Sequence, residues 1–311
     1  RIEPCEKLGI PHGSIRRNVS GCWNLGYCGM GCPTNAKQSM LVTTIPAALD
    51  QGLSLIHSTR VVKISSRLGR AVTLDARGMK ADQVGVNADM GPHHIRVQAR
   101  HFVLCGGAIN NPALLLRSKV PDPHDNLGAR TFLHPSSVSA ALMDEDVVAY
   151  SGAPQTIYSD HFLDSLPHTG PMGFKLEAPP IHPILAGITL PGYGVDHAAW
   201  MTRLPKMHVA IALMRDGFHP ESDGGRVTIR NDGSPVLDYP ISRYVWEGLR
   251  HSLKVMAEVQ FAAGARIVMP LHEDGKPYRS WADARRAIDS LPMQALRTRV
   301  ASAHVMGGCG M

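Results

Sequence analysis

Apolar residues recur at helical spacing in one long segment of the chain. Val245, Leu249, Leu253 and Met256 follow one another at intervals of three and four positions, and Gly264 stands just past this pattern. Such spacing places the apolar side chains on one face of a helix, and glycine readily adopts the backbone conformation that ends a helix. The sequence therefore predicts a core-facing helix that stops near Gly264.

Strand patterns dominate the region before this helix. Residues 226–230 and 235–239 alternate in polarity around Asn231-Asp232-Gly233-Ser234, a turn sequence typical of hairpins because Asn, Asp and Gly tolerate positive φ. Residues 207–214 form a further apolar run. We therefore expect mostly antiparallel sheet between about residue 136 and residue 240.

The first third of the chain predicts shorter elements. Pro46 and Gly52 bracket an apolar run, which indicates a short helix over residues 44–49. Residues 53–55 and 61–64 are expected to form two short strands, because they are rich in apolar and β-branched residues. The polar segment from Ser65 to Pro92 suggests hairpins at the surface.

A strand, a glycine turn and a helix follow. The segment 94–104 alternates and then becomes apolar, Gly106 and Gly107 break it, and a helix is expected to begin at Pro112. Such a junction exposes backbone N–H groups and a helix N-terminus, which suits a phosphate or the edge of a cofactor. A plain turn is the alternative interpretation.

Composition excludes several classes of protein. The chain has 311 residues, of which 44% are hydrophobic and 19% are charged, so it can bury a core and is not intrinsically disordered. A net charge of +6 is scattered along the chain instead of forming the cationic stripe that binds nucleic acid. No apolar run reaches the ~20 residues of a membrane span. Two domains are expected.

The six cysteines do not predict a metal site or a disulfide framework. Cys22, Cys28 and Cys32 lie close together, but no fourth ligand stands at zinc spacing. His93-His94 and His134 also lack neighbours at ligand spacing. We therefore expect reduced thiols and no bound metal.

Four motifs occur in one order along nearly the whole chain. They are Cys28-Gly-Met-Gly-Cys-Pro with Ala36-Lys-Gln-Ser, Cys105-Gly-Gly-Ala-Ile-Asn-Asn-Pro with Ala113-Leu-Leu-Leu-Arg-Ser, Leu127-Gly with Phe132-Leu-His-Pro, and Ser302-Ala-His-Val-Met-Gly-Gly-Cys-Gly-Met. Together they resemble the glucose-methanol-choline (GMC) family of flavin oxidoreductases, in the branch near long-chain alcohol dehydrogenases and cholesterol oxidase.

The resemblance implies a fold and a domain division. It implies an α/β flavin-binding, Rossmann-like domain that is incomplete here, together with an α+β antiparallel-sheet substrate domain. Residues 1–135 and 291–311 would belong to the FAD-binding domain, and residues 136–290 to the substrate-binding domain. The first strand with its G-x-G-x-x-G fingerprint is absent, so the chain is expected to be an internal fragment that by itself binds FAD weakly.

The resemblance also implies site residues. The backbone of Gly106, Gly107 and Ala108 would approach FAD, and the main chain of Val61 would meet the adenine. His304 would remove the hydroxyl proton of an alcohol while hydride leaves for the flavin. An imidazole suits this role because it accepts and returns a proton near neutral pH.

The implied reaction leaves several alternatives open. The substrate would be a primary or secondary alcohol, apolar or a sterol, and either oxygen or a quinone would accept the electrons. The protein would be cytoplasmic, with peripheral attachment to the inner membrane as a second option. A catalytically inactive fragment or decayed gene copy is the alternative to an enzyme, and a flavin hydroxylase or an NAD enzyme is the rival within the enzymes.

Overall fold

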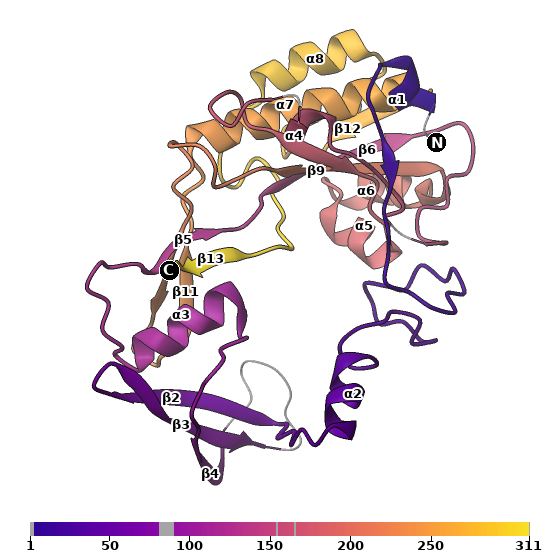
Figure 1. Cartoon of the computed structure of the whole chain (residues 1–311). Helices are drawn as coiled ribbons and strands as arrows, with labels where there is room; N and C mark the ends of the chain where they lie inside the picture. The colour runs from indigo at the N-terminus through magenta and orange to yellow at the C-terminus, as the bar shows by residue number, and fades with distance from the viewer. Residues whose placement is uncertain (1–2, 81–89, 154, 165, 311) are drawn as a thin grey trace. The chain divides into compact units, whose positions relative to one another are not determined.

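The computed structural model describes residues 3–80, 90–153, 155–164 and 166–310 (Figure 1). The chain divides into two compact units. Unit 1 comprises residues 1–44, 134–222 and 241–302, and unit 2 comprises residues 45–133, 223–240 and 303–311. Each unit is therefore assembled from three separate stretches of the chain.

A six-stranded sheet forms the centre of unit 1. In spatial order its strands are β1 (Gly13–Ser14), β7 (Ile157–Ser159), β8 (Phe174–Glu177), β9 (Met207–Met214), β6 (Ser136–Leu142) and β12 (Ile267–Pro270). All neighbouring pairs are antiparallel, and β6 pairs with β9 from Ser136 opposite Leu213 to Leu142 opposite Met207. The strands between residues 136 and 240 are antiparallel as expected, but three α-helices also lie in this region, so it is less dominated by sheet than expected.

Two long helices pack on this sheet. They are α7 (Arg243–Ala262) and α8 (Trp281–Ser290), and they run side by side (Figure 1). Ser242 and Ser280 cap them, each accepting a hydrogen bond from an N–H group in the first turn. The shorter helices of unit 1 are α1 (Glu3–Lys7), α4 (His161–Asp164), α5 (Pro183–Thr189), α6 (Gly194–Met201) and a 3-10 turn over Leu204–Lys206.

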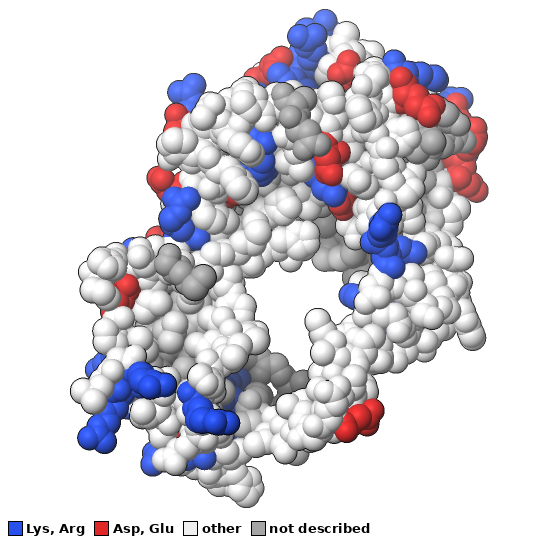
Figure 2. Space-filling view, viewed as in Figure 1, with Lys and Arg blue, Asp and Glu red and all other residues white. Residues whose placement is uncertain are grey.

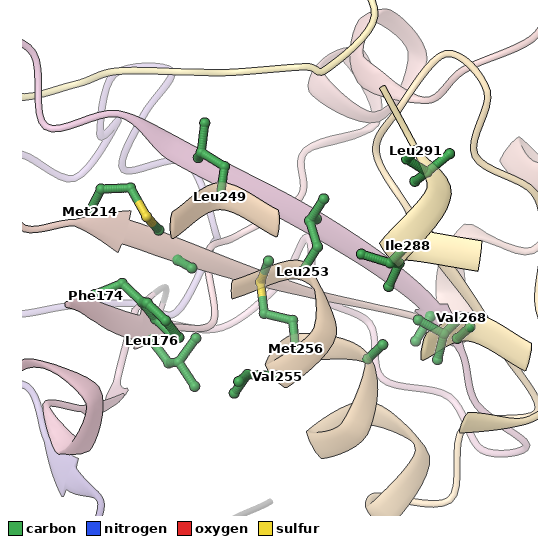
Figure 3. Packing of buried hydrophobic residues seen from close by; sticks show 14 of the residues in the cluster. Phe174, Leu176, Met214, Leu249, Leu253, Val255, Met256, Val268, Ile288 and Leu291 are labelled. Atoms are coloured by element: carbon green, nitrogen blue, oxygen red, sulfur yellow. The ribbon is translucent and has the colours of Figure 1, made fainter. Parts of the chain in front are cut away.

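Alternation along the strands gives unit 1 two apolar layers. Ala212 and Met214 of β9 face α7, where they join Leu249 and Leu253 in one buried cluster (Figure 3). Met207 and Val209 of the same strand belong to a second cluster with residues of α5. Because successive strand residues point to opposite faces, a single strand supplies both layers.

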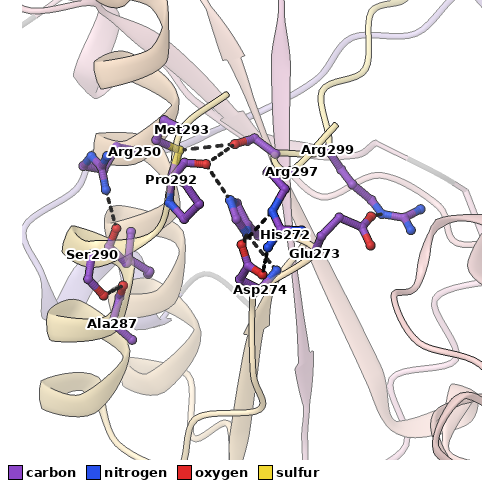
Figure 4. Close-up of polar contacts among 12 residues, drawn as sticks. Arg250, His272, Glu273, Asp274, Ala287, Ser290, Pro292, Met293, Arg297 and Arg299 are labelled. Atoms are coloured by element: carbon purple, nitrogen blue, oxygen red, sulfur yellow. Dashed lines mark hydrogen bonds and ion pairs between the residues drawn. The ribbon is translucent and has the colours of Figure 1, made fainter. Parts of the chain in front are cut away.

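Polar contacts tie the segment after α8 to the loop after β12. Asp274 pairs with Arg297, and Glu273 Oε1 lies 2.9 Å from Arg299 Nε (Figure 4). The buried His272 ring donates from Nε2 to the carbonyl of Pro292 at 3.0 Å. These contacts hold the segment that follows α8 within unit 1.

Unit 2 is built from smaller pieces. A meander of β2 (Thr59–Arg67), β3 (Arg70–Met79) and β4 (Met90–Gln98) stands beside helix α3 (Gly107–Arg117). Two antiparallel pairs complete it: β10 (Arg226–Ile229) with β11 (Pro235–Asp238), and β5 (Leu127–Phe132) with β13 (Met306–Cys309). The short helix α2 (Thr44–Asp50) lies at its boundary.

Several predicted elements are confirmed. The structure contains the helix that stops before Gly264, the hairpin around Asn231–Ser234, the strand over 207–214 and the short helix from residue 44. It also contains a meander after Ser65, although residues 81–89 of that expected segment lie outside the described residues. Gly264 has φ +90°, as the predicted helix stop requires.

Other predictions are wrong. Residues 53–55 form no strand and remain exposed, since the strand there begins only at Thr59. The strand expected over 94–104 ends at Gln98, and Val103 is 83% exposed. The helix begins at Gly107, so Pro112 lies inside it. Apolar character was misleading at residues 53–55 and at Val103, because these side chains are exposed.

The Rossmann-like part of the fold prediction is not formed by the described residues. A Rossmann unit needs parallel strands joined across a helix, whereas every pair of named strands in the described ranges is antiparallel. Both units are therefore α+β. The units also divide the chain differently from the expected domains, because residues 1–44 and 291–302 cluster with the six-stranded sheet and residues 223–240 cluster with unit 2.

Candidate functional site

The glycine turn before α3 is closed by a side chain of the helix itself. Asn111 Oδ1 accepts a hydrogen bond from the N–H of Gly106 at 2.8 Å, and Asn111 Nδ2 donates to the carbonyl of Leu104 at 3.0 Å. One amide group thus binds the backbone on both sides of Cys105. Asn111 is a residue that the sequence prediction missed, although its place in Gly-Gly-Ala-Ile-Asn-Asn-Pro could have indicated it.

Gly107 leaves the start of α3 open. Its φ is +81°, it is exposed, and a Cβ added there would meet no atom within 4 Å. Among the described residues, no side chain caps the first turn of this helix. The first N–H groups of a helix have no partner within the helix, so this turn presents accessible backbone donors.

Pro112 explains why a second glycine segment packs here. Proline has no N–H to donate to the carbonyl of Ala108, four residues earlier in the helix. Gly308 of β13 comes against that carbonyl: a Cβ on Gly308 would lie 2.4 Å from Ala108 O and 3.2 Å from Pro112 Cγ. Only a residue without a side chain fits, so the two glycine motifs form one packed feature of unit 2.

Strand β13 carries the region of His304 to the same place. Met306 pairs with Phe132 and Gly307 with Thr131, which anchors β13 along β5. Exposed His304 precedes β13 by two residues. Because a fully extended chain spans about 3.5 Å per residue, the His304 backbone lies within about 14 Å of Gly308. The structure therefore brings the Gly106–Ala108 turn and His304 into one region.

Val61 lies on a different element of unit 2. It stands on the edge strand β2 of the meander, next to an irregularity in the pairing with β3. The N–H of Ile64 on this strand donates to Ser118 Oγ at 2.9 Å, and Ser118 follows directly after α3. Helix α3 is thus joined to β2 at one end and to β13 at the other.

Cationic side chains surround the meander. Strands β2 and β3 carry five Lys or Arg residues, namely Arg60, Lys63, Arg67, Arg70 and Arg77, and one carboxylate, Asp75. Arg96 of β4 donates from Nε to Asp75 Oδ1 at 2.7 Å and holds the pKa of that carboxyl below its usual value. In Figure 2 blue side chains gather over this meander.

The cysteine-rich loop shows no metal site. Within the described ranges, no group of three or more His, Cys, Asp or Glu side chains could hold a metal ion, and all six cysteines are free. Hydrogen bonds from the Thr34 hydroxyl and the Ala36 N–H lower the pKa of Cys32 to about 7. Among the described residues, no helix is long and apolar enough to cross a membrane.

Sequence comparison places the chain among known proteins. The profile of the family described as GMC oxidoreductase matches residues 1–136. An uncharacterized GMC-type oxidoreductase of Mycobacterium tuberculosis is 31% identical over 90% of this chain and 40% of its own length. The long-chain-alcohol oxidase FAO4A of Arabidopsis thaliana is 25% identical over 99% of this chain and 42% of its own length. The chain thus spans less than half the length of these relatives.

Solved structures share the fold at low sequence identity. Pyridoxine 4-oxidase from Mesorbium loti superposes with a TM-score of 0.55 at 16% identity, over 91% of this chain and 55% of that one. Formate oxidase from Aspergillus oryzae, whose structure concerns FAD modification, gives a TM-score of 0.50 at 12% identity, over 80% and 50% of the two chains. FAD is the cofactor of the family. By these relatives and by the profile match, the chain belongs to the GMC oxidoreductase family.

Proposed function

We propose that the protein containing this chain oxidises an apolar primary or secondary alcohol to an aldehyde or ketone, with FAD as the hydride acceptor. The observation that supports this most directly is the packing of Gly308 against the Ala108 carbonyl, because it unites two of the four family motifs within unit 2. The alcohol oxidases among the relatives support the substrate class.

The residues of unit 2 fit a dinucleotide in two respects. Gly106 and Gly107 leave the first N–H groups of α3 accessible, and backbone donors at a helix start favour a phosphate. The cationic surface of β2 and β3 suits a negatively charged pyrophosphate. In this proposal the turn Gly106–Ala108 and the main chain of Val61 hold the cofactor.

His304 is the proposed acid–base group. Its imidazole accepts the hydroxyl proton of the alcohol while the adjacent carbon loses a hydride, so that the C–O bond becomes a carbonyl. When bound, FAD supplies the two-electron acceptor for that hydride. Oxygen or a quinone then takes the electrons, which leaves the distinction between oxidase and dehydrogenase to experiment.

We further propose a role for each unit and a cellular location for the protein. Unit 2 would be the part of the FAD-binding domain that this chain supplies. The Rossmann-like sheet of that domain would be completed by other residues of the protein. Unit 1, with its antiparallel sheet, would be the substrate domain. We place the protein in the cytoplasm, with attachment to the inner-membrane surface as a variant of this proposal.

Anaerobic stopped-flow reduction by substrate tests the role of His304 in the FAD-loaded protein. Replacement His304→Gln should slow flavin reduction by about 10² to 10⁴, the usual contribution of a positioned acid–base group, and leave reoxidation nearly unchanged. His101→Gln is the matched control, because His101 is also exposed in unit 2 but lies outside both motifs. A reduction rate of His304→Gln within about threefold of the unsubstituted protein would remove His304 from the mechanism.

A further inference from the structure

The tip of the hairpin between β2 and β3 exposes a leucine. Arg67 and Arg70 pair across the two strands, so Leu68 and Gly69 form a two-residue turn. Their φ values are +50° and +75°, which are characteristic of a type I′ turn, where asparagine followed by glycine is preferred. Leu68 is 95% exposed, so its side chain contributes no burial while its backbone is strained. Nothing within the described residues explains a leucine at this position.

Two arginines flank this leucine. Arg67 and Arg70 are both exposed and stand directly opposite each other. Like charges at directly opposite positions destabilise an antiparallel pair. Among the described residues, neither guanidinium group has an ion-pair partner. The pair therefore favours an anion that a binding partner supplies.

These arginines belong to the cationic face of the meander. Lys63 lies on the same side of β2 as Arg67, because alternate residues of a strand point the same way. Lys63 is opposite Asp75, and Asp75 is opposite Arg96, whose Nε donates to the carboxylate at 2.7 Å. The three strands carry six Lys or Arg residues and this one carboxylate. The other face is apolar and has these residues in register: Ile64, Leu74 and Val97.

An anionic lipid surface fits this combination of groups. Lipid phosphates attract cationic side chains, and the boundary between headgroups and acyl chains accepts an exposed apolar side chain. A nucleic acid or a soluble anion would neutralise the arginines but leave Leu68 in water. The tip lies about 20 Å along β2 from Val61, at about 3.3 Å per strand residue, so it is separate from the proposed cofactor contact.

We propose that this hairpin tip docks on an anionic lipid bilayer, with Leu68 at the boundary between headgroups and acyl chains and with Arg67 and Arg70 on lipid phosphates. The inference goes beyond the proposed oxidation, because it needs neither FAD nor His304. It would also give the proposed membrane attachment a contact surface. Vesicle binding and flavin reduction are separate measurements, so either can fail alone.

Co-sedimentation of the full chain with vesicles, without FAD, tests the proposal. Vesicles of equal parts phosphatidylglycerol and phosphatidylcholine should bind the protein, with half of it bound at about 1 mM lipid or less. Vesicles of phosphatidylcholine alone should bind little. Raising the salt from about 50 mM to about 500 mM should release most of the protein, because salt screens this attraction. Absence of binding to the anionic vesicles, or equal binding to both kinds, would overturn the proposal.

Two variants locate the contact. Leu68→Asn installs the residue that the turn prefers, so it should fold at least as well and weaken vesicle binding about five- to tenfold. Arg67→Gln together with Arg70→Gln should weaken it about 25-fold, since each cation near such a surface contributes about fivefold. Unchanged binding by both variants would place the contact elsewhere and overturn the proposal.

Unit 1 supplies the matched controls. Leu296 is 94% exposed with a φ of +65°, so Leu296→Asn makes the same change in the same kind of backbone. Lys276→Gln together with Arg279→Gln removes two exposed cations. Both controls should bind vesicles within about twofold of the unsubstituted chain, as expected for residues outside the contact. Controls weakened as much as the tip variants would show unspecific attraction by net charge and overturn the proposal.

A single-stranded oligonucleotide separates lipid from nucleic acid as the partner. It carries phosphates but no acyl layer, so it should bind more weakly than the anionic vesicles, and Leu68→Asn should not change its affinity. Oligonucleotide binding as tight as vesicle binding, with both unaffected by Leu68→Asn, would assign the cationic face to nucleic acid and overturn the proposal.

Discussion

Units 1 and 2 differ in what holds them together. Unit 1 has two apolar clusters on the two faces of one sheet, with Phe174, Leu249 and Leu253 fully buried. Unit 2 has few fully buried large side chains in its described residues, and close glycine contacts join its strands. Unit 1 therefore depends on side-chain packing, whereas unit 2 depends on the close backbone fit around its glycines.

The largest effect is expected from truncating the core of unit 1. Phe174→Ala removes a fully buried ring that stacks on Phe162 with centroids 4.8 Å apart. Loss of burial plus the remaining cavity should lower the free energy of unfolding by about 3–5 kcal/mol. Phe218→Ala, at a position 65% exposed, is the control and should cost little. Hydrogen exchange should show the loss in peptides of α7, and a loss confined to β2 and β3 would contradict the division into units.

The next largest effect concerns unit 2. Gly308→Ala would bring a Cβ to 2.4 Å from Ala108 O at a backbone φ of +75°. Strain and steric clash together should destabilise unit 2 by about 3 kcal/mol. Gly310→Ala is the matched control, because a Cβ there would meet nothing within 4 Å. Hydrogen exchange of β5 should rise in the first variant only, and equal exchange in both would argue against the close approach.

Lowering the pH should destabilise unit 1 before unit 2, with a smaller effect than either substitution. The folded pKa of His208 in unit 1 is about 4, below the ordinary value of 6.5. Between these values the unfolded chain binds a proton that the folded chain does not, so unit 1 should lose about 2–3 kcal/mol as pH falls from 6.5 to 4. Asp75 in unit 2 has a depressed pKa, so its contribution is lost only as pH falls below about 4.

A pH series of hydrogen exchange measures this difference. Unit 1 peptides should lose protection first, and His208→Gln should abolish most of the loss between pH 6.5 and 4. If β2 and β3 lost protection over the same interval and to the same extent, His208 would not be the cause.

Local patterns predicted the elements of this fold whose side chains meet a core. The apolar spacing of α7 and the turn chemistry at Asn231–Ser234 both act within a few residues, and both predictions are confirmed. Leu53, Leu55 and Val103 are apolar yet exposed, so the same reasoning failed there. Helix α8, with its amphipathic face and its Ser280 cap, was not predicted.

The candidate site was predictable only as a set of motifs. The sequence placed Gly106, Gly107, Ala108 and His304 in family motifs, and their roles remain predictions. Their common location depends on the pairing of β13 with β5, a contact between residues more than 170 positions apart that no local pattern encodes. Likewise, the role of Asn111 in closing the turn follows from three-dimensional contacts.

The pairing of β13 with β5 also has a consequence for biosynthesis. A ribosome releases Leu127–Phe132 long before Met306–Cys309, so the nascent chain carries β5 without its β13 partner while most of unit 1 is being made. An unpaired strand edge is a template for association with other chains. Strand β13 therefore covers an edge of β5 that stays open in the growing chain until residue 309 has been made.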